Sequence, residues 1–299
     1  MTTPQQRADR IAAATRRARA GMDLLTLEAA EDLRDLYESI IAQLQRELRA
    51  YADDAGNLRA ELLNQYLRQA QQRLNELGPS TAGLLRDYLH DAAERGADIW
   101  RGDPGVPRAA LPGLADAAAR FVTEFIAADG LQLSDRLWRL ENGAKEAVAE
   151  TLRRNVVLGR DASRAAREFL DGEVPAEIAR DLGKDGIENL ERSIAAALTT
   201  DPNCAYQRAL RVYRTEMNRA HGEAYRNGLK AHPEIVGERF VLSPNHPKPD
   251  ICDDLAAQDL FGMGPGVYPV GQAPWPAHPN TLSYLVAVFD WEVADARPA

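Results

Sequence analysis

The 299-residue sequence contains little lysine, little cysteine and no long apolar run. Only four of its 36 basic residues are lysine, so arginine supplies most of the positive charge. Cys204 and Cys252 are too few for a disulfide framework and fit a reducing compartment. No stretch approaches the roughly 18 apolar residues that a membrane helix needs, and the first twenty residues lack the apolar core of a secretory signal. We therefore expect a soluble protein made in the cytoplasm, without a membrane partner.

The charge balance is acidic, with a net charge of −9. This argues against broad nucleic-acid binding, because phosphate contact depends on basic patches. The exception is the first twenty residues, where five arginines stand against Asp9 and give a charge of +4. This arm could contact DNA or an acidic partner, but a solvated helix start explains it as well, and we favour that interpretation. The arginines are Arg7, Arg10, Arg16, Arg17 and Arg19.

Apolar residues recur at helical spacing from about residue 23 to residue 77. The stripe is narrow, so we expect extended helices that bury it against other helices of the chain or against another chain. Gly56 is the predicted kink, and Gly78-Pro79-Ser80 the predicted helix end, because proline lacks an N–H donor. The stripe consists of Leu33, Tyr37, Ile40, Leu44, Leu48, Leu58, Leu62, Tyr66, Ala70 and Leu74.

Proline and glycine divide the rest of the chain. Three prolines and three glycines between Arg101 and Gly113 predict a linker. We therefore expect an N-terminal helical arm at 1–101, a linker at 102–113, and one domain at 114–299. Within that domain, 114–232 is predicted to be helical and 233–299 to form a small α+β module with a proline-rich loop. The predicted fold class is mainly α, with extended N-terminal helices and a helical middle.

Two strands are expected in the module, at Glu238–Leu242 and Thr281–Val293. About forty residues connect them, which is too long for a simple hairpin and typical of a functional or interface-forming loop. The Gly262–Gly266 segment predicts a turn cluster rather than a phosphate loop, since Pro265 would block a helix opening there.

The long loop also carries residue types that bind metals, namely His246, Asp250, Cys252 and His278. Zinc takes four such ligands, or three and a water. The spacing here is irregular, without a Cys-x-x-Cys or His-x-x-x-His pair, so we expect hydrogen bonding and turn formation rather than a metal site. Of the four residues, Cys252 and His278 are the two candidate metal ligands.

Two further groups bear on catalysis. Glu216 lies within an otherwise apolar helix face, where an unpaired carboxylate would be costly. We expect an internal salt bridge or bonds from loop N–H groups; a catalytic carboxylate is the alternative. Cys252 is a poor nucleophile candidate, because Asp253 and Asp254 beside it would raise the pKa of its thiol.

The second half of the chain carries short motifs in a defined order. They are Arg214-Thr215-Glu216 in a helix, Ser243, the His246–Asp253 segment with Asp250 and Cys252, the Gly262–Pro269 turn, and Pro276–Asn280 with His278. This order resembles the head-morphogenesis, or minor head protein, family of tailed bacteriophages, the phage Mu F-like proteins. The resemblance covers roughly Leu131–Phe289, whereas residues 1 to about 110 match only in being helical.

The resemblance implies a minor capsid protein of the virion, assembled in the host cytoplasm and associated with the portal or the major capsid protein. Its role would be in head assembly and in DNA packaging or delivery, without enzymatic activity or a cofactor. Family members commonly carry His-Pro-x-Cys-x-Cys where this chain has threonine and serine at the two cysteine positions, Thr281 and Ser283. Cys252 and His278 are therefore expected to be structural remnants. The alternative function is a metal-dependent hydrolase or effector-type toxin that uses Glu216, His246, Cys252 and His278.

Overall fold

The computed structural model describes residues 3–51, 60–127, 129–157, 184–244, 246 and 249–294. The predicted kink at Gly56 lies outside these residues. The fold is mainly α with a small antiparallel sheet near the C-terminus, as the sequence predicts. Within the described part, none of the helices is both long and apolar enough to cross a membrane.

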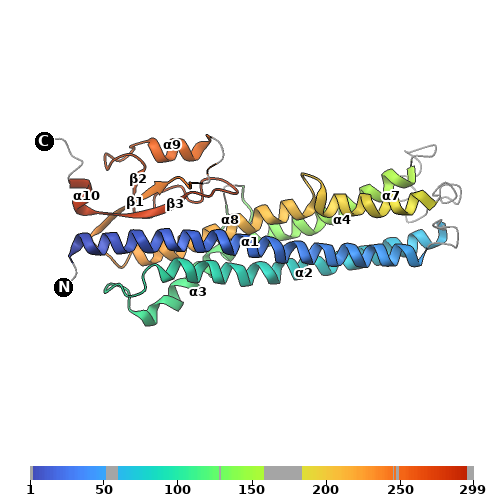
Figure 1. Cartoon of the computed structure of the whole chain (residues 1–299), viewed down its shortest axis with the longest axis horizontal. Coiled ribbons are helices and arrows are strands. Elements are labelled where there is room, and N and C mark those ends of the chain that lie inside the picture. The colour runs from blue at the N-terminus through green and yellow to red at the C-terminus, as the bar shows by residue number, and fades with distance from the viewer. Residues whose placement is uncertain are drawn as a thin grey trace. The chain divides into compact units, whose positions relative to one another are not determined.

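The elements are labelled in Figure 1. The helices are α1 (Pro4–Ala50), α2 (Ala60–Asp98), α3 (Leu111–Glu124), α4 (Leu133–Val157), α7 (Lys184–Ala195), α8 (Ala205–Leu229), α9 (Ile251–Ala257) and α10 (Asp290–Ala294). Short helical turns lie at Arg108–Ala110 and Ala196–Thr200. The strands are β1 (Ile235–Val241), β2 (Val267–Pro269) and β3 (Tyr284–Phe289).

The chain forms two compact units, and each unit combines segments that are distant in the sequence. The first unit comprises 1–29, 85–133 and 211–299, and the second comprises 30–84 and 134–210. This grouping differs from the predicted arm, linker and domain. The reason is that α1, α2 and α8 are long enough to contribute residues to both units.

The second unit buries the predicted apolar stripe within the chain itself. Tyr206 of α8 packs edge-on against Tyr37 of α1, with ring centroids 6.1 Å apart, and its hydroxyl donates to the Ala30 carbonyl at 3.0 Å. Arg49 of α1 donates to both carboxylate oxygens of Glu191 in α7, at 2.5 and 2.8 Å. Helices of the same chain therefore cover the stripe. Its described and buried members are Leu33, Tyr37, Ile40, Leu44, Leu48, Tyr66, Ala70 and Leu74.

The predicted helix end at Gly78-Pro79-Ser80 is wrong, because α2 continues through Pro79. The Ser80 hydroxyl donates to the Glu76 carbonyl at 2.9 Å and so supplies a hydrogen bond in the interrupted turn. Gly78 also lets α4 approach closely, since a Cβ there would lie 2.2 Å from Glu141 Oε2. Packing on both sides of the proline thus outweighs the lost backbone bond.

The first unit carries the sheet, in the order β2-β1-β3 with both pairings antiparallel. The two predicted strands are confirmed and lie side by side. The second ends earlier than predicted, at Phe289, because the Glu292 carboxylate accepts the Phe289 N–H at 2.8 Å and α10 begins at Asp290. Strand β2 was missed. It is short and ends in Pro269, which an edge strand tolerates.

Buried aromatic residues join the sheet to the helices of this unit. Trp100, which is fully buried, stacks on Tyr225 of α8 at 5.3 Å and donates its indole N–H to the Tyr225 carbonyl at 3.0 Å. Figure 1 shows the sheet beside α8 and the first part of α1. The same apolar cluster contains Ile11 of α1, Phe240 of β1 and Phe289 of β3.

The segment predicted as a linker is a packed corner of the first unit. Asp103 has no exposed side-chain surface and accepts hydrogen bonds from Arg7 at 2.6 and 2.9 Å, from Gly105 N–H at 2.9 Å, and from Arg10. Burial alone would raise the pKa of Asp103, but the bonds from Arg7 and Gly105 outweigh it and lower that pKa. Prolines and glycines here therefore shape a fixed turn.

A glycine pair on α2 tests the close helix contact. At Gly96 a Cβ would lie 2.2 Å from the His221 carbonyl oxygen, a backbone atom that cannot swing away. We expect Gly96→Ala to lower the free energy of unfolding by about 1–3 kcal/mol. At Gly83 nothing lies within 4 Å of the added methyl, so Gly83→Ala should raise it by up to about 1 kcal/mol. Urea denaturation measures both, and equal effects would contradict the packing.

The buried His221 makes stability depend on pH. Burial, with Arg19 and Arg95 nearby, lowers the pKa of His221 to about 3. The folded protein therefore stays neutral at His221 while the unfolded chain takes up a proton below about pH 6.5, so stability falls as pH falls through this range. The pKa of His232 is lowered too, mainly by burial, so His232 also makes the stability fall as pH falls.

We expect His221→Gln to flatten the decline of unfolding free energy between about pH 6 and pH 4 by up to about 1.4 kcal/mol per pH unit. Urea denaturation across this range measures the slope. His90→Gln, at a half-exposed side chain of α2, is the comparison variant, and it should change the slope less than His221→Gln does. Identical slopes in wild type and His221→Gln would refute the assignment.

Candidate functional site

A buried ion pair anchors the long connection between β1 and β3, residues 242–283, which is called the crossover below. Glu238 of β1 has no exposed side-chain surface and accepts hydrogen bonds from Arg226 of α8 at 2.7 and 3.1 Å. The Ala273 N–H donates to the same carboxylate at 2.9 Å, and the Ala273 carbonyl accepts from Arg226 at 2.6 Å. One carboxylate and one guanidinium thus hold a helix, a strand and the middle of the crossover together.

A second set of bonds fixes the end of the crossover on α8. The Asn280 N–H donates to the Thr215 hydroxyl at 3.2 Å, and the Asn218 amide donates to the Thr281 carbonyl at 3.0 Å. The Thr281 hydroxyl lies 3.3 Å from Cys252 Sγ. Three motif segments that are distant in the sequence therefore meet at one place.

Glu216 forms the internal salt bridge that the sequence predicts. Its side chain is buried, and Arg219 Nε donates to its carboxylate at 2.9 Å. The Arg219 guanidinium also lies 4.2 Å from the ring centroid of Phe125. Arg214, the first motif residue of α8, lies two residues before Glu216 and is half-buried. Glu216 is thus engaged within the helix framework.

Helix α9 lies in the first part of the predicted loop and was missed. The Asp250 carboxylate accepts from Cys252 N–H at 2.7 Å, and the Asp253 carboxylate accepts from Asp250 N–H at 2.7 Å, a reciprocal cap. The sequence signal for this helix start was the pair of Asp250 and Asp253, two acidic residues three positions apart. These N–H groups are the main cause of the lowered pKa of Asp250 and of Asp253.

The four metal-competent residues of the loop come close together despite their irregular spacing. Single donor atoms of Asp250, Cys252 and His278 all lie within 4.8 Å of one another. Asp250 also belongs to a neighbouring trio with His246 and Asp253, in which His246 Nε2 lies 2.9 Å from the Asp253 carboxylate.

The Cys252 thiol is fully buried. Burial raises the pKa of Cys252, and Asp250 adds to the rise, while the hydroxyls of Thr281 and Ser283 oppose it. The predicted direction is therefore confirmed, but the main cause is burial rather than the charges of Asp253 and Asp254. With its pKa raised, the thiol is poorly suited to act as a nucleophile.

Ser243, Trp275 and the turn cluster at 262–266 have structural roles. The buried Ser243 follows β1, and its carbonyl accepts from the His246 N–H at 3.0 Å. Trp275 packs inward against Phe240 and over Gly222, where a Cβ would meet its indole at 2.1 Å. The predicted turn cluster is confirmed by positive φ angles of 64°, 108° and 68° at Gly262, Gly264 and Gly266.

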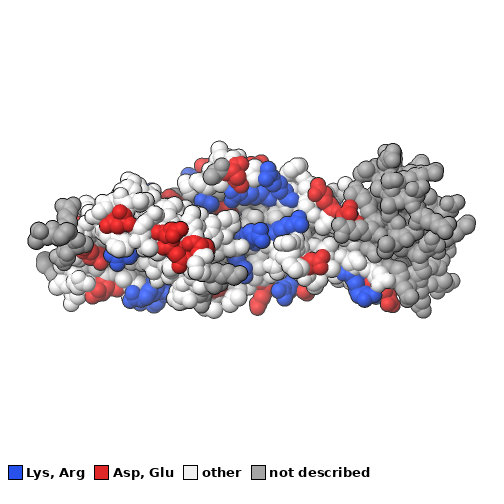
Figure 2. Space-filling view, turned by 90° about the horizontal axis from the view of Figure 1, so that it is seen from above, with Lys and Arg blue, Asp and Glu red and all other residues white. Residues whose placement is uncertain are grey.

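The surface of the module is partly acidic and partly apolar. Figure 2 shows acidic side chains over the part of the molecule that carries α9, which contributes Asp253 and Asp254. Ile251, Leu260 and Phe261 of the same segment are 53%, 66% and 43% exposed. Three large apolar side chains between residues 251 and 261 are thus exposed.

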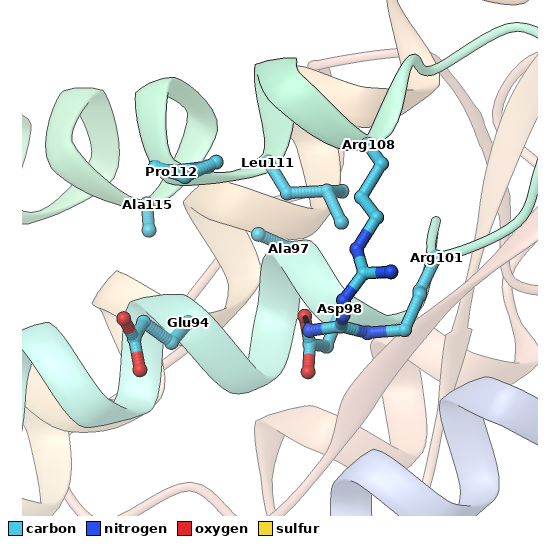
Figure 3. Close-up of a pocket in the computed structure, with 8 residues that line it drawn as sticks. All are labelled: Glu94, Ala97, Asp98, Arg101, Arg108, Leu111, Pro112 and Ala115. Carbon is cyan, nitrogen blue, oxygen red and sulfur yellow. Dashed lines mark hydrogen bonds and ion pairs between the residues drawn. The ribbon is translucent and has the colours of Figure 1, made fainter.

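A pocket of about 200 Å³ lies between the end of α2 and the start of α3, away from the predicted site residues. Figure 3 shows Arg101 and Arg108 on the same side of it as Asp98, with Leu111 on the apolar side. Asp98 accepts a hydrogen bond from Arg101. The pocket therefore has an internally paired charge at its rim.

Several arginines of the basic N-terminal arm serve the fold. Arg7 and Arg10 bind Asp103, and Arg19 donates to Asp23 at 2.6 Å. Arg16 and Arg17 are exposed. The charge that a DNA contact would need is thus largely used inside the first unit.

Comparison of the chain with protein-family models, curated proteins and solved structures found no match. The resemblance to phage head-morphogenesis proteins therefore stays a prediction that rests on the motif residues.

The Arg226–Glu238 pair should dominate the stability of this site. Glu238→Gln leaves the Arg226 guanidinium buried without a counter-charge, and we expect the free energy of unfolding to fall by about 3–5 kcal/mol. Glu223→Gln is the matched control on α8, because Glu223 pairs with the exposed Lys230 at 3.9 Å and should cost less than about 1 kcal/mol. Urea denaturation measures both changes, and a small effect at Glu238 would show that the pair does not anchor the crossover.

Proposed function

We propose that this protein is a minor capsid protein of a tailed bacteriophage, associated with the portal and acting in head assembly and in DNA packaging or delivery. Its C-terminal module would dock on portal or capsid subunits in the virion, without catalysis. The observation that carries the proposal is the meeting of the motif segments. Thr215 contacts Asn280, and Cys252 contacts Thr281, the residue directly after Asn280.

The arrangement of the module supports a docking role. Its crossover is held by buried bonds from α8, so the surface that it presents is preorganised and loses little freedom on binding. The exposed Ile251, Leu260 and Phe261 lie on this same module and supply apolar contact area. A rigid segment with exposed apolar side chains fits a surface for a neighbouring subunit.

One observation favours the alternative, a metal-dependent hydrolase or effector-type toxin. Asp250, Cys252 and His278 converge, which a catalytic metal site would require. Against it, the proposed catalytic carboxylate Glu216 is buried and paired with Arg219. We therefore keep the structural role as the proposal.

The test of the proposal is association with heads and portal. We expect the tagged protein to co-purify with phage heads and to be captured by purified portal protein. Leu260→Ser should weaken portal capture at least tenfold, because a central apolar contact typically contributes about 1–2 kcal/mol or more. Affinity is measured by titrating portal protein onto the immobilised chain.

Leu24→Ser is the matched control, since Leu24 is similarly exposed, at 69%, on α1. It should bind portal like wild type. Absence of the protein from purified heads would overturn the proposal. Capture that Leu260→Ser leaves intact would keep the function and reject this surface.

A further inference from the structure

We infer that Asp250, Cys252 and His278 form a binding site for a zinc ion, with the carboxylate, thiolate and imidazole as its three protein ligands. The inference is independent of the proposed function, because it rests only on the positions of these donor atoms. They come from both ends of the crossover, at the start of α9 and just before β3.

The orientation of His278 is set by its backbone. His278 Nδ1 lies 2.7 Å from the Pro279 carbonyl, and since a carbonyl only accepts, Nδ1 carries the proton. In the neutral ring Nε2 then holds a lone pair. This is the usual second-shell arrangement of a metal-binding histidine, in which the other ring nitrogen donates to an oxygen.

The Nε2 atom faces a second electron-rich atom. It lies 3.1 Å from Asp250 Oδ2, is shielded from solvent, and makes no hydrogen bond within the described part of the chain. Because two lone pairs repel at this distance, a positive charge must lie between them, either a second ring proton or a metal ion. In tetrahedral zinc sites with metal–ligand distances of about 2.0–2.1 Å, nitrogen and oxygen ligands lie about 3.3 Å apart, close to the observed separation.

The remaining groups fit the same cation. The two carboxylate oxygens of Asp250 have different neighbours: Oδ1 accepts the Cys252 N–H, and Oδ2 faces His278. The Cys252 thiol supplies the soft donor, and a thiolate with imidazole and carboxylate favours zinc over magnesium or calcium. Asp250 and His278 keep 37% and 31% of their side-chain surface exposed, so solvent water can take the fourth position.

Two other clusters of possible ligands differ from this trio. His246 is held by Asp253 at 2.9 Å and is not needed as a ligand. His90, Asp91 and Glu94 form a trio on α2 in which all three residues are exposed and no cysteine takes part. An exposed trio of this kind binds divalent ions weakly, so it is the natural control for adventitious uptake.

The experiment titrates the purified full-length chain with zinc alone and, separately, with cobalt as a spectroscopic probe. We expect one zinc per chain by elemental analysis after dialysis, and a thiolate-to-cobalt charge-transfer band. Cys252→Ser should abolish the band, and Cys252→Ser and His278→Gln should each weaken zinc binding at least 100-fold. Asp250→Asn keeps the helix cap and should weaken binding at least tenfold.

Cys204→Ser and His90→Gln are the controls, at the other buried thiol and in the exposed trio, and both should bind zinc like wild type. Circular dichroism confirms that each variant is folded. Should Cys252→Ser fail to fold, His278→Gln and Asp250→Asn decide the matter through the same titration. No saturable zinc binding, unchanged binding in these variants, or loss of binding in His90→Gln would each overturn the site.

Discussion

The buried pair of Arg226 and Glu238 is the interaction on which the C-terminal module depends. Neither charge is solvated, so each needs the other and the Ala273 backbone to satisfy its hydrogen-bonding groups. This requirement fixes the middle of the crossover against α8 and β1. The ends of the crossover then have little freedom, and the bonds of Asn280, Thr281 and Cys252 place them.

The same constraint explains how one helix serves both framework and site. Helix α8 is buried on most of its faces, including at Tyr213, Met217 and Tyr225, so its polar residues must find partners inside the protein. Thr215, Asn218 and Arg226 find them in the crossover, Arg226 at the Ala273 carbonyl. The polar side chains of α8 therefore act as specific connectors, while its apolar side chains supply the burial that stabilises the unit.

Anchoring of this kind is compatible with a docking surface and with a bound cation. A preorganised crossover lowers the conformational entropy lost on contact with another subunit. It also brings donor atoms from Asp250 and His278 near one another although 28 positions separate them in the sequence. A zinc ion bound there would add a cross-link between the start of α9 and the segment before β3, which would stabilise the same surface.

The sequence by itself determined the features that depend on neighbouring residues. Helical periodicity indicated the long helices, glycine spacing indicated the turn at 262–266, and the cost of a buried charge predicted that Glu216 is paired, without naming its partner. The tertiary structure alone decided the continuation of α2 through Pro79, the packed corner at Asp103 and the partner of Glu238. The alternation of Glu238 with Phe240 on one strand face was a signal that it points inward, but no local pattern names Arg226. Such pairings join residues far apart in the chain, and their energies depend on burial, which only the packed structure defines.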